Sequence, residues 1–158
     1  MKKKVHMIFA ALLTALMLTA CGEDPALTQF KKSMDSFCTS ISEIDNSINN
    51  IDAQSEDATA QLLSYLDDLD RTFQTFADLD FPEEFDYLEN LADESSEYMT
   101  EAVKSYHEAY GNGTYNESMA EYAKQNYSRA YKRIQNIISF INGEEPTDAD
   151  LPIEYEND

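Results

Sequence analysis

The sequence contains few of the residues that build a turn-rich or cross-linked fold. Its 158 residues include no tryptophan, four glycines, four prolines and two cysteines. So few glycines and prolines disfavour a fold of many short strands and turns, and they favour long helices. Two cysteines are too few for a disulfide framework to replace a hydrophobic core. We therefore expect a single helical domain stabilised by apolar burial, as the chain length also predicts.

Positive charge is scarce as well. The chain has 11 Lys and Arg side chains against 31 Asp and Glu. Lys2, Lys3 and Lys4 precede Cys21 and no acid does, so residues 21–158 hold 8 cations, 31 acids and a net charge of −23. This charge would repel phosphates, so it argues against a nucleic-acid partner. It also disfavours lying flat on anionic lipid, and otherwise it mainly predicts solubility.

Residues 1–21 combine three lysines, a short apolar run, small residues and a final cysteine. The apolar run from Val5 to Met17 is too short to span a bilayer stably. The last four residues are Leu18, Thr19, Ala20 and Cys21. The whole segment resembles the signal peptide and lipobox of bacterial lipoproteins.

That resemblance implies diacylglyceryl transfer to the Cys21 sulfur, followed by cleavage before Cys21. The lipidated chain is then expected outside the cytoplasm, anchored to the cell membrane by its acyl chains (palmitate, for example). The alternative is an ordinary signal peptide cut near Ala20, with Cys21 incidental.

Four later segments carry apolar residues at alternating spacings of three and four, which predicts amphipathic helices. Asp24 and Pro25 are expected to start the first, and residues 55–57 the second. Pro82 is expected to start the third, and Thr114 to Glu117 to form a capping box for the fourth. The apolar stripes are Leu27, Phe30, Met34, Phe37, Ile41, Ile44, Ile48 and Ile51; Leu62, Leu66, Leu69, Phe73 and Phe76; Phe85, Leu88, Ala92, Ser95, Met99, Ala102, Tyr106 and Ala109; and Ala120, Ala123, Tyr127, Ala130, Ile134, Ile137 and Ile141.

Four segments of similar length with short links predict an all-α, up-down-up-down antiparallel four-helix bundle. The alternative is a coiled-coil-like helical hairpin that dimerises into a four-helix assembly. The expected domains are a signal peptide at 1–20, a lipidated cysteine and tether at 21–25, the bundle at 26–142 and an acidic disordered tail at 143–158.

The expected topology places the phenylalanines at the anchored end and most tyrosines toward the opposite end. A tyrosine offers a rigid apolar ring and a polar tip, so a cluster of tyrosines can bind a protein partner. The competing interpretation is that these rings fill core space beside alanines. The candidate partner-binding residues are Tyr98, Tyr106, Tyr110, Tyr115 and Tyr122.

We find no catalytic, cofactor-binding or metal-binding motif. In the predicted register no acid or histidine occupies a core position, so a di-iron site is not expected. Cys38 is expected to be a buried, unreactive thiol whose pKa is raised by Asp35 and Glu43. His107 is expected to be partly exposed.

These observations favour a non-catalytic, membrane-anchored interaction or binding module over an enzyme. One alternative is an accessory lipoprotein that binds a small ligand or a cation, with a cavity among the small residues of the third and fourth helices. Another is a structural spacer or assembly factor of the envelope. An enzyme would require a buried acid or a pair of histidines that the predicted register places outside the core.

Overall fold

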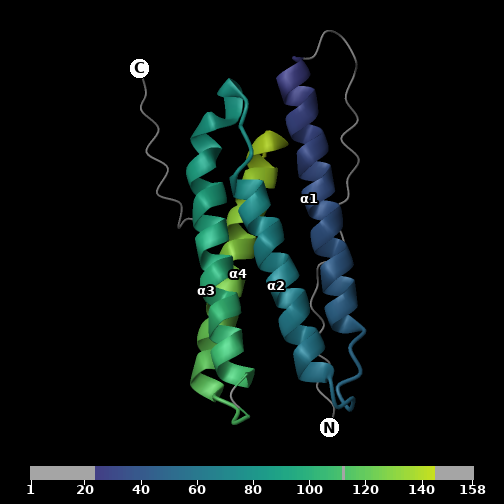
Figure 1. The fold of residues 1–158 in the computed structure, drawn as a ribbon. Helices are drawn as coiled ribbons and strands as arrows, with labels where there is room; N and C mark the ends of the chain where they lie inside the picture. The colour runs from purple at the N-terminus through teal and green to yellow at the C-terminus, as the bar shows by residue number, and fades with distance from the viewer. Residues whose placement is uncertain (1–23, 112, 145–158) are drawn as a thin grey trace.

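The computed structural model describes residues 24–111 and 113–144. They form the helices α1 (Pro25–Asn49), α2 (Ala58–Ala77), α3 (Glu89–Tyr110) and α4 (Glu117–Ile141), and a 3₁₀ helix, η1 (Glu83–Leu88), precedes α3. Consecutive α-helices run antiparallel (Figure 1). The predicted all-α antiparallel four-helix bundle is therefore confirmed. The leader with Cys21, and residues 145–158 of the predicted tail, lie outside the described residues.

The start of α1 has the predicted cap. The Asp24 carboxylate accepts a hydrogen bond from the Ala26 N–H at 3.0 Å, and Pro25 occupies the first helical turn. A carboxylate at this position satisfies one of the free N–H groups, and proline there loses no helical hydrogen bond.

The start of α4 differs from the prediction. The cap is Asn116, whose side-chain oxygen accepts from the Met119 N–H at 3.2 Å. The predicted capping box beginning at Thr114 is therefore wrong. Asparagine is as good a cap as threonine, and with Asn116 in that role Glu117 becomes the first residue of α4, where its negative charge suits the helix dipole.

The segment after Pro82 also differs, because it winds as the tighter η1 before α3 begins at Glu89. The Phe85 N–H donates to the Pro82 carbonyl at 2.7 Å, a contact across three residues. Short 3₁₀ segments are common connectors at helix ends. Here η1 carries the chain from α2 into α3 while Phe81 and Pro82 stay buried.

Small side chains form the contact between α3 and α4. Their backbones make the most extensive approach of any helix pair in the described bundle. The alanines along this contact have no exposed surface, so no water-sized space remains beside them. The fully buried alanines are Ala92, Ala102, Ala109, Ala123 and Ala130.

Large side chains separate α1 from α2. Phe37 stacks on Phe76 with ring centroids 4.3 Å apart and meets the edge of Phe73 at 5.4 Å. Phe30 contacts Phe81 at 4.7 Å. These rings gather at the end of the bundle where α1 begins, as the sequence predicted. Within the described bundle, α1 makes extensive backbone contact with α2 only.

Replacing Ala102 by leucine should destabilise the bundle, because the contact between α3 and α4 has no space for three more carbons. We expect the free energy of unfolding to fall by about 1–3 kcal/mol, measured by urea denaturation followed by circular dichroism. Ala60→Leu, on an exposed part of α2, should change the stability by less than about 0.5 kcal/mol. Equal stability of the two variants would contradict the close packing described above.

Candidate functional site

A carboxylate occupies the last buried position of α1. Asp45 is 8% exposed, and both of its hydrogen-bond partners come from α4. Tyr127 donates its phenol proton to Asp45 Oδ1 at 3.1 Å, and Tyr131 donates to the same oxygen at 3.2 Å. The two phenol oxygens lie 3.1 Å apart. This network ties α1 to α4 through side chains.

The buried Asp45 contradicts the prediction that no acid occupies a core position. The predicted stripe continued from Ile41 through Ile44 and Ile48, but these two isoleucines are only half-buried and Asp45 takes the inward position. The reason is geometric. A straight helix drifts by about 20° per heptad from a strict seven-residue repeat, or about 40° over the two heptads from Phe30 to Ile44, so the inward position passes to the neighbouring Asp45.

Burial sets the protonation behaviour of this network. Desolvation raises the pKa of Asp45 above its ordinary 3.8, and the hydrogen bonds from Tyr127 and Tyr131 partly oppose that rise. Burial also raises the pKa of both phenols, so they remain protonated donors at neutral pH. In the described residues, no group of three or more His, Cys, Asp or Glu is placed to hold a metal ion.

Three of the five candidate tyrosines form one row at the end of the bundle where α3 connects to α4. Tyr106 and Tyr110 stack with centroids 6.3 Å apart, and Tyr110 meets Tyr115 at 5.3 Å. Exposure increases along the row, from half-buried Tyr106 to Tyr115 at 58%. Burial, and then the neighbouring Tyr110, raise the pKa of Tyr106 to about 12. Tyr106 is therefore uncharged at neutral pH, and the row becomes more accessible towards Tyr115.

The other two candidates lie apart from that ring-to-ring row. Tyr98 lies beside the guanidinium groups of Arg129 and Arg133, 5.7 and 5.8 Å from its ring centroid. These are cation–π distances, so Tyr98 packs against α4 rather than joining the row. Tyr122 lies on α4 and is 43% exposed. The candidate cluster therefore divides into a row of three, a packed ring and an exposed ring.

Two further residues with reactive side chains, Cys38 and His107, lie outside the tyrosine row. Cys38 is half-buried against the core, and burial first and the charge of Asp35 second raise the pKa of its thiol. This confirms the predicted direction and the effect of Asp35, whereas the predicted effect of Glu43 is absent and the thiol is half-buried rather than buried. His107 Nε2 lies 2.7 Å from Asp67 Oδ1, which links α3 to α2, and its side chain is 43% exposed.

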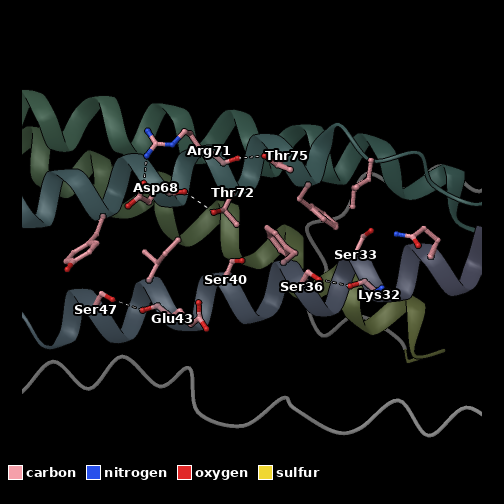
Figure 2. Close-up of a pocket in the computed structure, with 16 residues that line it drawn as sticks. Lys32, Ser33, Ser36, Ser40, Glu43, Ser47, Asp68, Arg71, Thr72 and Thr75 are labelled. Carbon is pink, nitrogen blue, oxygen red and sulfur yellow. Dashed lines mark hydrogen bonds and ion pairs between the residues drawn. The ribbon is translucent and has the colours of Figure 1, made fainter.

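A groove of about 770 Å³ lies between α1 and α2. Figure 2 shows the labelled residues of α1 along one edge and those of α2 along the other. Hydroxyl groups are unusually frequent on both edges. The residues that line it are Gln29, Lys32, Ser33, Ser36, Phe37, Ser40, Glu43, Ile44, Ser47, Tyr65, Asp68, Arg71, Thr72, Thr75, Phe76 and Leu79.

The spacing of serines in α1 also indicates this groove, although the apolar stripes alone do not. Ser33, Ser36, Ser40 and Ser47 are spaced by three, four and seven residues, which is the same period as the core stripe of α1. A periodic row of small polar residues beside a core stripe marks a helix edge that is not filled by bulky side chains.

Hydrogen bonding within the groove leaves mostly acceptor atoms on its walls. Four hydroxyls donate their single proton to the carbonyl four residues earlier in their own helix, so their lone pairs remain available. Asp68 forms an ion pair with Arg71. The four donor hydroxyls and their carbonyl partners are Ser36 to Lys32 at 3.0 Å, Ser47 to Glu43 at 2.9 Å, Thr72 to Asp68 at 2.9 Å and Thr75 to Arg71 at 2.8 Å.

Comparison of this chain with known proteins gives no relative, so the chain is classified by its fold alone. It matches no protein-family model, and no curated protein or solved structure matches it. Across residues 24–111 and 113–144, none of the helices combines the length and apolar character needed to cross a bilayer. The class that the structure defines is an all-α antiparallel four-helix bundle.

The raised pKa of Asp45 predicts a pH-dependent stability difference between the wild-type chain and Asp45→Asn. When folding raises a carboxyl pKa, the associated stabilisation is complete below the unfolded value of 3.8 and is lost as pH rises through the folded value. The free energy of unfolding of the wild type should therefore fall relative to that of Asp45→Asn between about pH 3 and 7. Urea denaturation at each pH measures this.

The matched control is Asp93→Asn, which removes an exposed acid of α3. This variant reports the effect of lowering the net negative charge alone, and its pH profile is subtracted. Profiles of equal shape for the two variants would contradict an energetic cost of burying the Asp45 charge.

Proposed function

We propose that this chain is an extracytoplasmic lipoprotein, anchored to the cell membrane through lipidated Cys21, whose bundle is a non-catalytic ligand-binding module. The single observation that carries the binding role is the groove between α1 and α2. Its volume of about 770 Å³ lies inside the 300–1,000 Å³ range typical of ligand sites. The lipobox-like segment that ends at Cys21 supports the anchoring.

The chemistry of the groove favours binding over catalysis. Its lining residues include no histidine or cysteine. The hydroxyls of Ser36, Ser47 and Thr72 donate to backbone carbonyls instead of to a general base. Nucleophilic catalysis by a hydroxyl requires a base that accepts its proton. Hydrogen bonding to a ligand is therefore the role that these groups suit.

The proposed anchor would set the orientation of the groove. Pro25 begins α1 four residues after Cys21. The part of the groove near Gln29 and Lys32 would then be closest to the membrane, and the part near Ser47 would be the most distant. A ligand would then enter the groove from the side of the bundle rather than from either of its ends.

A second candidate function is binding of a protein partner at the end of the bundle that is farther from the proposed anchor. The observation that favours it is the exposure of Tyr115 at 58% and of Tyr122 at 43%. Exposed aromatic rings are frequent in protein interfaces because they bury a large area at a low cost in conformational entropy.

The anchor is tested by substituting each cysteine in turn. Cys21→Ser should abolish incorporation of labelled palmitate and release the chain into the medium, because one or no acyl chain gives only weak membrane binding. Cys38→Ser is the matched control and should retain both the label and the membrane fraction. Equal labelling of the two variants would contradict lipidation at Cys21.

The tyrosine end is tested by replacing Tyr110, Tyr115 and Tyr122 with alanine. Recovery of any surface partner by cross-linking and pulldown should fall at least about tenfold, as expected when interface aromatic residues are removed. Helicity should be unchanged. Tyr87→Ala is the control, since Tyr87 is 44% exposed next to Phe140 in the other half of the bundle. Unchanged recovery from the triple variant would eliminate this second candidate.

A further inference from the structure

The groove between α1 and α2 is electrically balanced within a strongly acidic chain. Two cations, Lys32 and Arg71, and two acids, Glu43 and Asp68, line it. By contrast, residues 21–158 carry a net charge of −23. A polyanion would meet the repulsive field of the whole chain, whereas a polycation would be attracted by that field but would find no excess of negative charge within the groove itself. Charge therefore favours a neutral ligand.

The walls require a ligand that both donates and accepts hydrogen bonds. The serine and threonine oxygens offer lone pairs, because their protons are already donated to backbone carbonyls. Gln29 and Lys32 offer N–H donors. A purely apolar ligand would displace water from these groups without replacing its hydrogen bonds, at a cost in free energy. A ligand with many hydroxyl groups satisfies both kinds of wall residue.

The apolar base and the length of the groove further restrict the shape of the ligand. The accessible apolar surface comes mainly from the half-buried Ile44 and Leu79, beside the almost fully buried rings of Phe37 and Phe76. The serine row from Ser33 to Ser47 spans 14 residues, or about 21 Å at 1.5 Å per residue. The ligand is therefore elongated, with hydroxyls along its edges and an apolar face between them.

We infer that this groove binds a neutral oligosaccharide segment. Sugar rings present hydroxyls at their rim and C–H groups on their faces, and several linked rings match the length of the groove. The inference rests on the proposed function, because it names the ligand class of the same site. Cell-envelope polysaccharides are the class of polymer that a chain anchored outside the cytoplasm would meet.

The test is calorimetric titration of the full acylated chain in a zwitterionic detergent that has no sugar headgroup. The neutral probes are tetra-N-acetylchitotetraose, cellotetraose and maltotetraose. Spermine serves as the cationic probe and tetraglutamate as the anionic probe. At least one tetrasaccharide is expected to bind, whereas spermine and tetraglutamate are expected not to bind in the groove.

Three variants locate the binding. Ser40→Leu places a large side chain in the middle of the groove and should abolish binding, with helicity and melting temperature unchanged or raised. Thr39→Leu is the matched control, because Thr39 is exposed and does not line the groove. Thr72→Val keeps the shape of the side chain but removes its hydroxyl, and it should weaken binding about 5- to 10-fold.

The outcomes separate the two proposals. If spermine or tetraglutamate binds in a Ser40-dependent way and no tetrasaccharide does, the ligand class is wrong and the groove remains the site. If a tetrasaccharide binds equally well to the wild type, Ser40→Leu and Thr72→Val, the groove is not the site and both proposals are overturned. Failure of every probe to bind also overturns both.

Discussion

The side chains at two helix contacts differ in size, and the rest of the structure depends on that difference. Between α3 and α4 the contact is made by buried alanines, which let the two backbones approach along much of their length. Between α1 and α2 it is made by Phe37, Phe73 and Phe76, whose rings hold the helices further apart. The space outside these rings is edged by serine and threonine, which are too small to fill it. The groove is a direct consequence.

The same difference explains the buried carboxylate. Because the extensive backbone contact of α1 is with α2, long side chains from α4 must reach across to hold it. Tyr127 and Tyr131 do so, and Asp45 accepts both of their hydrogen bonds. A buried carboxylate costs desolvation energy, which the raised pKa of Asp45 expresses. Burying this carboxylate therefore lowers the stability of the bundle. In return, it provides hydrogen bonds of fixed direction between α1 and α4, which a leucine at this position would not provide.

The fold could be read from the sequence because the alternating spacing of apolar residues and the scarcity of glycine and proline both specify helices. The clustering of phenylalanines at one end of the bundle was also predictable, because antiparallel helices bring the start of α1 and the end of α2 to the same end. Asp45 could not be placed, because a strict heptad register does not include the slow drift of a real helix. The start of α4 was misplaced because Thr114 and Asn116 are both good caps, and only the three-dimensional turn decides between them.

The candidate sites were less predictable than the fold. Sequence position grouped five tyrosines, but Tyr98 packs against Arg129 and Arg133 while Tyr106, Tyr110 and Tyr115 form the row. The groove arises from the distance between two helices, and that distance depends on which side chains face each other across the contact. The serine spacing on α1 was visible in the sequence. The hydroxyl residues of α2, Thr72 and Thr75, indicate a groove only once α2 is known to pair with α1.

We propose that the space between α1 and α2 holds a carbohydrate segment in the cell envelope. The most direct measurement places a photoreactive amino acid at Ser36, inside the groove, or at Thr39, on the exposed face of the same helix. Each chain is cross-linked in intact cells, and mass spectrometry identifies the adducts. The account predicts glycan adducts at position 36 and none at position 39. Equal glycan labelling at both positions, or none at position 36, would contradict it.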